Sequence, residues 1–114
     1  MSRDTDRATF IAQKLLIHGR RSPEDRARDV SYIHDTFQAF GSALAQVRTL
    51  WLEQVVPHLH PRHANRAQRL ARNLFADVTD TIRRATQVGL QIGRPVSVEG
   101  VWEVLQVGVE RVVE

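Results

Sequence analysis

The sequence predicts an all-α protein, a single domain over residues 1–114 that contains four helices. Hydrophobic residues make up 42 % of the chain and charged residues 25 %, which is typical of a globular domain. Apolar residues recur every three or four positions through most of the sequence, and the four prolines lie at the ends of these stretches or between them. The expected arrangement is a long central antiparallel helical hairpin with a short helix at each end of the chain.

The two short helices are predicted at about residues 4–18 and 97–113. In the first, Ile11 and Leu15 belong to an apolar stripe with helical spacing, and Gly19 follows as a natural end. The second is rich in valine, which favours a strand by propensity. Its apolar residues nevertheless form a helical stripe with glutamates opposite, so the prediction is a helix, with a strand as the alternative.

The two long helices are predicted at about residues 23–56 and 62–93. Ser22 is a good N-cap for the first, and its apolar period continues without a proline to the connection at residues 57–63. Gly41 is the one position where this helix is expected to bend. Each helix would be roughly 45 to 50 Å long at 1.5 Å per residue. Because two prolines interrupt a short connection, the helices are expected to run antiparallel.

Arginines gather on one side of the predicted helix at residues 62–93. Projected at about 100° per residue, seven of them fall within an arc of roughly 120° opposite the apolar side. With two aspartates, residues 62–94 carry a net charge of +5, whereas the rest of the chain carries −2. The seven are Arg62, Arg66, Arg69, Arg72, Arg83, Arg84 and Arg94.

A row of arginines at helical pitch is suited to a phosphate backbone, which requires charge and reach but no reading of bases. Few aromatic residues lie near the row, so sequence-independent contact is expected rather than base stacking. Two alternatives remain open: the arginines form a solvated face, or they pair with acidic residues of the last helix or of a protein partner. The predicted nucleic-acid-binding residues are Arg62, Arg66, Arg69, Arg72, Arg83, Arg84 and His63.

Three histidines lie at the connection with an H-x-H-x-x-H spacing: His58, His60 and His63. This spacing is compatible with a three-histidine zinc site, but no cysteine or nearby acid completes the ligand set. The interpretation is therefore a basic turn that extends the arginine row, with no metal and no cofactor expected.

His34 raises two further alternatives. It precedes Asp35 in "YIHDTFQAF", which resembles the histidine of kinase dimerisation helices and of phosphotransfer bundles, although the phosphotransfer Lys-Gly is absent. Arg28 and His34 also resemble the R-x(4–6)-H motif of the HEPN ribonuclease fold. A boundary histidine with a bonded ring nitrogen is the favoured interpretation. Because there is no phosphate-binding glycine loop, nucleophile elbow or carboxylate pair, no catalytic residue is predicted and the protein is not expected to be an enzyme.

The amino-acid composition excludes several classes of protein. The chain has no cysteine, which excludes thiol nucleophiles, disulfides and cysteine zinc sites. No apolar run approaches the roughly 20 residues of a spanning helix, and the charged start "MSRDTDRATF" does not resemble a secretory signal. We therefore expect a cytoplasmic protein without membrane contact.

In size, charge and helix count the chain resembles the small helical subunits of CRISPR effector complexes. The resemblance covers the whole chain as a profile of shape and charge, without a specific motif. It implies a non-enzymatic subunit that binds a single-stranded nucleic acid or a guide–target duplex through basic residues and packs against other protein subunits. The alternative from another class is a helical protein–protein interaction or dimerisation module.

Overall fold

The computed structural model describes residues 3–113, with side chains from Asp6 onwards, and this part of the chain is helical without any strand. The all-α class is thus confirmed, and the strand alternative for the valine-rich end is wrong. The principal helices are α1 (Arg3–Ile17), α2 (Pro23–Phe40), α3 (Leu44–Leu50), α4 (Pro61–Leu74), α5 (Asp80–Gln91) and α6 (Val98–Gly108). Short 3₁₀ or π turns extend them: η1 (His18–Arg20), η2 (Gly41–Ala43), η3 (Trp51–Val55), η4 (Val56–His58) and η5 (Val109–Val113).

The prediction of four helices is wrong, because each long helix is divided. The segment predicted at residues 23–56 is interrupted at Gly41, whose φ of 47° lies in the left-handed region. Only glycine adopts such a conformation without a steric penalty, so α2 ends there and η2 redirects the chain into α3. The bend expected at Gly41 is therefore a complete helix end.

The segment predicted at residues 62–93 is also interrupted, between α4 and α5. The Thr79 side chain accepts a hydrogen bond from the Ile82 amide at 3.3 Å and caps the start of α5. The indole Nε1 of Trp102 donates to the Phe75 carbonyl at 3.1 Å and satisfies the end of α4. A local start signal and a distant side chain together replace one long helix by two.

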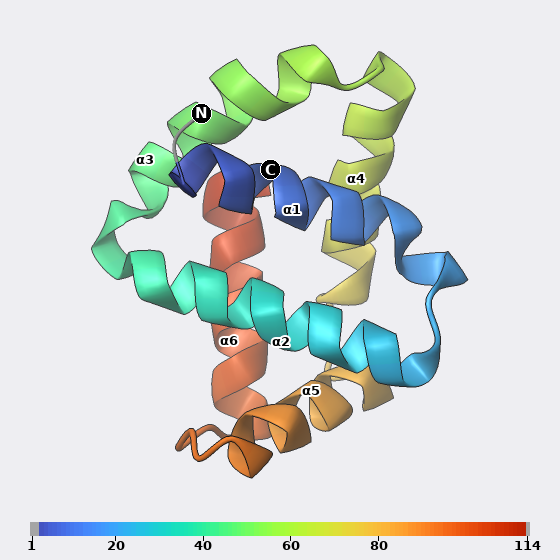
Figure 1. Cartoon of the computed structure of the whole chain (residues 1–114), viewed down its shortest axis with the longest axis vertical. Helices are drawn as coiled ribbons and strands as arrows, with labels where there is room; N and C mark the ends of the chain where they lie inside the picture. The colour runs from blue at the N-terminus through green and yellow to red at the C-terminus, as the bar shows by residue number, and fades with distance from the viewer. Residues whose placement is uncertain (1–2, 114) are drawn as a thin grey trace.

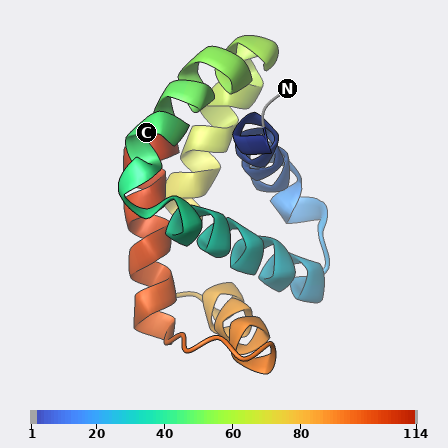
Figure 2. The same ribbon diagram turned by 60° about the vertical axis from the view of Figure 1, so that its left-hand side comes forward.

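The molecule is consequently shorter than a hairpin of two long helices would be. Its principal extents are 36 × 30 × 23 Å, and a helix of the length predicted from the sequence would exceed the longest of them. Instead α2 packs along α5, α1 packs against α4 and η3, and α6 runs behind α1 and α2 (Figure 1). Figure 2 shows α5 below α4 and beside the lower end of α6, which it contacts.

The predictions for the two short helices are confirmed. Residues 4–18 correspond to α1, and residues 97–113 correspond to α6 followed by η5. The side chain of Ser97 caps α6 by accepting a hydrogen bond from the Gly100 amide at 3.1 Å. The apolar stripe outweighs the strand propensity of the valines because Val101, Leu105 and Val109 all point into the core.

Within the core, α2 and α6 cross closely. Gly108 of α6 lies directly against the buried ring of Phe37 of α2, and a Cβ at this glycine would overlap the ring. Every principal helix contributes buried apolar side chains. Among the buried residues are Ile11, Leu15, Val30, Ile33, Val47, Trp51, Ala67, Ala71, Ile82, Leu105 and Val112.

Charged groups fix the corner between α1 and α2. The carboxylate of buried Asp29 accepts two hydrogen bonds from Arg21, at 2.9 and 3.3 Å, and Lys14 lies 3.6 Å away. Arg26 donates to the carbonyls of His18 and Gly19, both at 2.8 Å, and so satisfies carbonyls of η1, the turn that follows α1. A buried carboxylate needs such partners, because an unpaired charge inside a protein is strongly destabilising.

We predict that Gly108→Ala destabilises the protein by about 1–3 kcal/mol, the usual cost of overpacking, because the Phe37 ring is enclosed and cannot move aside. Gly19→Ala is the matched control, since a Cβ there meets nothing within 4 Å and no positive φ is required. Urea denaturation measures both variants. Equal midpoints would contradict the close crossing.

Partial burial lowers the pKa of His18 below the 6.5 of a free imidazole, and the charge of Arg26 lowers it further, while Asp29 opposes both. The unfolded state therefore binds a proton more readily than the folded state. The corresponding stability is present above pH 6.5 and is lost as pH falls from 6.5 through the lower folded pKa.

We predict that His18→Asn reduces the loss of unfolding free energy between pH 7 and pH 5 relative to the unchanged protein. The comparison isolates His18 because the other four histidines are present in both proteins. An identical pH dependence in the two denaturation series would refute the assignment.

Candidate nucleic-acid interface

The candidate interface is the exposed side of α4. The sequence of this helix, PRHANRAQRLARNL, contains four arginines and no acidic residue. Its inner side is held against the core by buried Ala67 and Ala71, whose small side chains allow α4 to lie close to its neighbours. The arginines are excluded from that side by their charge. All four, Arg62, Arg66, Arg69 and Arg72, are exposed, as predicted for one face of a helix.

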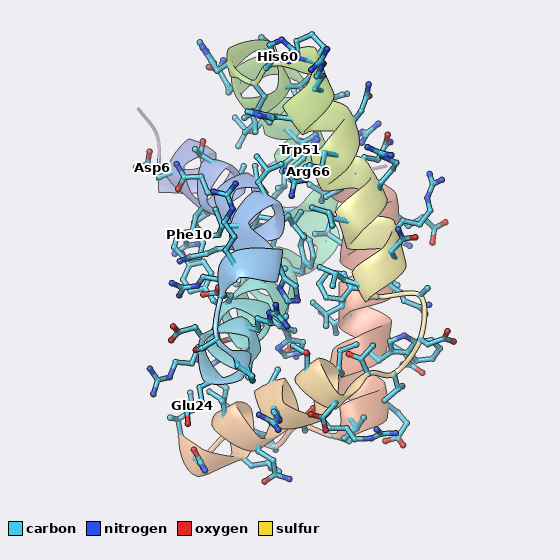
Figure 3. All side chains as sticks on the ribbon, turned by 90° about the vertical axis from the view of Figure 1, so that its right-hand side faces the viewer. Asp6, Phe10, Glu24, Trp51, His60 and Arg66 are labelled. Carbon is cyan, nitrogen blue, oxygen red and sulfur yellow. The ribbon has the colours of Figure 1, made fainter. Side chains whose placement is uncertain are left out.

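The connection before α4 forms the tip of the molecule. His60 caps the helix, its Nδ1 accepting a hydrogen bond from the Arg62 amide at 3.1 Å, and Pro61 occupies the first helical position. His63 is exposed, and its ring centroid lies 5.9 Å from that of His60. Figure 3 shows His60 at this end and Arg66 further along α4. Among residues 6–113, no group of three histidine or acidic side chains is placed to hold a metal ion.

Three arginines of α4 have no partner in the described part of the chain. Arg62, Arg66 and Arg69 form no ion pair and no side-chain hydrogen bond with another described residue, and we call these three the α4 arginine face. Together with His63, Asn65 and Gln68 they line an open hollow of about 760 Å³. Arg72 differs, because it does interact within the protein and lines a separate hollow with Glu110.

The remaining predicted arginines do not continue this face. The break before α5 turns that helix away from the axis of α4 (Figure 1). The prediction that all seven arginines lie along one side of a single helix is therefore wrong. Arg84 pairs with Asp80 at 2.9 Å, and Arg94 pairs with Asp35 of α2. Arg83 is exposed on α5. The structure therefore brings Arg62, Arg66, Arg69 and His63 together and places the others elsewhere.

His34 is enclosed in α2 rather than presented to solvent. It is 4 % exposed, and its Nδ1 lies 3.1 Å from the Asp35 carboxylate, which agrees with a structural histidine that has a bonded ring nitrogen. Arg28, its partner in the HEPN-like motif, has a side chain that is 71 % exposed and lies 3.9 Å from Asp25. A phosphotransfer or ribonuclease histidine must reach a substrate, so this burial does not favour either interpretation.

A second hollow lies across the outer side of α2, and the sequence did not indicate it. Arg7, Tyr32, Asp35 and Arg94 line it from α1, α2 and the loop before α6. Since these residues come from three separate segments of the sequence, only the packing of the helices brings them together.

No protein-family model matches the chain, and neither a search of curated proteins nor a search of solved structures found a match. Within residues 3–113, no helix has the length and apolar character required to cross a membrane.

Proposed function

We propose that this chain is a non-enzymatic basic helical subunit that binds a nucleic-acid backbone without reading its sequence. The observation that carries the proposal is the α4 arginine face, three exposed guanidinium groups without an acidic partner on a helix that contains no acid. Arginines that are already paired give little attraction for a polyanion, whereas unpaired ones release counterions from a bound phosphate backbone.

The spacing of these residues suits repeated phosphate contacts. Arg69 lies seven positions after Arg62, which is about 10 Å along the helix axis at 1.5 Å per residue. The long side chains extend that reach on both sides, and Asn65 between them supplies a neutral hydrogen-bonding group. The positive end of the α4 dipole adds to the attraction, since the row begins in the first turn.

The exposed side of α4 offers little for base recognition. The helix has no phenylalanine, tyrosine or tryptophan, so stacking of unpaired bases has no platform there. Contacts to phosphate position a protein on nucleic acid without distinguishing sequences. Sequence-independent binding is the mode that such a surface supports.

A place within a larger ribonucleoprotein assembly fits the same features. The small helical subunits of CRISPR effector complexes, which this chain resembles in size, helical content and charge, hold guide–target strands through basic residues. Under this proposal the α4 arginine face contacts the strands, and other surfaces contact the neighbouring subunits.

We predict that Arg62→Ala/Arg66→Ala/Arg69→Ala weakens binding to any oligonucleotide by tenfold or more at low salt. Three phosphate contacts correspond to a slope of about −2 to −3 in log K against log salt, and the variant should lose most of it. Fluorescence anisotropy with labelled single-stranded and double-stranded oligonucleotides of one length measures affinity and slope.

The matched control is Arg20→Ala/Arg28→Ala/Arg111→Ala, which removes the same charge from exposed positions outside α4. It should retain most of the affinity, because the contacts on α4 are intact. Equal weakening by the two variants would show that only net charge matters, and an absence of binding at low salt would refute the proposal.

A second candidate function, a dimerisation module, is favoured by one observation. Leu90 and Ile92 at the end of α5 are 45 % and 61 % exposed, and large apolar side chains in such positions are often covered by another protein. We predict that, if a second copy covers them, Leu90→Ser/Ile92→Ser shifts the protein towards monomer in sedimentation equilibrium. A monomer at all concentrations would exclude self-association through this end of α5.

A further inference from the structure

The hollow on the outer side of α2 has the size of a small-molecule site. Its volume of about 570 Å³ lies within the range of roughly 300 to 1,000 Å³ that such sites occupy. Arg7 of α1 and Arg94 of the loop before α6 line it together with Tyr32, Asp35 and Gln38 of α2. None of these residues belongs to α4, so the hollow is separate from the α4 arginine face.

The charges that line the hollow are unbalanced. Arg94 is paired with Asp35, and these two groups neutralise each other. Arg7 has no ion pair with a described residue, and its guanidinium carbon lies 5.8 Å from the centroid of the Phe40 ring. The lining therefore carries one net positive charge, which is available to a single anionic group.

The paired groups of the hollow are held in place. Asp35 lies within hydrogen-bond distance of Nδ1 of His34, at 3.1 Å, and His34 is buried in the core. The carboxylate in turn holds Arg94 at the rim, which leaves other N–H groups of this guanidinium for a ligand. Donors that are fixed before binding lose little entropy when a ligand arrives.

Tyr32 provides a flat apolar surface in the same hollow. Its side chain is 40 % exposed, and its ring packs against Phe10 of α1 with a centroid distance of 4.2 Å and an interplanar angle of 49°. This contact fixes the ring, so that the exposed part is presented in one orientation. Gln38 is exposed nearby and forms no hydrogen bond with another described residue.

We infer that this hollow binds a small ligand in which one carboxylate or phosphate group is joined to a flat ring. Arg7 binds the anionic group, with Arg94 as a second donor, and Tyr32 packs against the ring. Guanidinium groups suit both anions because their planar donors match two oxygens at once. The ring and the anion are both required, since the hollow offers one contact for each.

Isothermal titration calorimetry with four probes tests the inference. Adenosine monophosphate and benzoate carry a ring and an anion, adenosine carries only the ring, and inorganic phosphate carries only the anion. We expect at least one of the first two to bind tenfold more tightly than adenosine and inorganic phosphate. Comparison of adenosine monophosphate with benzoate then shows whether the anion is a phosphate or a carboxylate.

Substitutions inside and outside the hollow test whether the probe binds there. Arg7→Gln should weaken the preferred probe at least tenfold and Tyr32→Leu at least threefold, whereas Arg20→Gln on η1, outside the hollow, should have no effect. Tyr32 is the only tyrosine of the chain, so its ring signals in an NMR spectrum of selectively labelled protein are unambiguous. They should shift when the probe is added, which a purely structural tyrosine would not show.

Three results would overturn the inference: binding of neither adenosine monophosphate nor benzoate at millimolar concentration, unchanged affinity for the preferred probe in Arg7→Gln, or adenosine or inorganic phosphate binding as tightly as the preferred probe. The triple variant of the α4 arginine face should bind the preferred probe with the affinity of the unchanged protein. Because that variant tests nucleic-acid binding separately, either proposal can fail while the other stands.

Discussion

The close crossing of α2 and α6 is the constraint on which the rest of the fold depends. Phe37 is one of the largest fully buried side chains, and it has room only because Gly108 carries no Cβ. With any other residue at position 108 the two helices would have to separate, and α6 would move away from α2. Dense packing of this kind tolerates little change in volume, so the crossing fixes the axis of α6 relative to α2.

From that position α6 controls where α4 ends and which side α4 exposes. Trp102 reaches the last turn of α4, and Gln106 donates to the carbonyl of Ala76 at 3.4 Å. At the other end, Arg48 of α3 donates to the Val112 carbonyl at 2.7 Å and ties the chain to η5. The hydrogen bonds of Trp102 and Gln106 satisfy carbonyls that the end of α4 leaves free, and they oppose the continuation of α4 into α5. The α4 arginine face is therefore a consequence of core packing as much as of its own sequence.

Local patterns were sufficient to predict some elements and insufficient for others. The helices at residues 4–18 and 97–113, and the arginine side of α4, depend on periodicity within one segment, which the sequence displays directly. The breaks at Gly41 and Thr79 have local signals, a glycine and a Thr-Asp helix start, but the apolar period continues across both and favours an unbroken helix.

What decided the break between α4 and α5, and which arginines are paired, lies far away in the sequence. The indole that satisfies the end of α4 comes from a residue 27 positions further on. Arg94 appeared to continue the arginine row, yet its partner Asp35 belongs to α2, which packs along α5. Arg7 and Tyr32 had no place in any pattern, because the hollow they share exists only after α1 and α2 pack. Long-range pairing of this kind leaves no period in the sequence.

Because many arginines are paired within the protein, the high arginine content does not by itself indicate a binding surface for a polyanion. Arginine supplies fifteen of the sixteen lysine and arginine residues, and many of them act within the fold: Arg21 and Arg26 fix a corner, and Arg48 satisfies a carbonyl. Exposed Arg20 and Arg83 each lie beside an arginine that is paired with an aspartate, so each adds one charge, which attracts a polyanion only weakly. On α4 three unpaired arginines lie within eight residues. The salt-dependent attraction to a nucleic acid grows with each phosphate that is contacted. The clustering of these arginines, rather than the total number of arginines in the chain, is therefore what makes α4 the proposed binding surface.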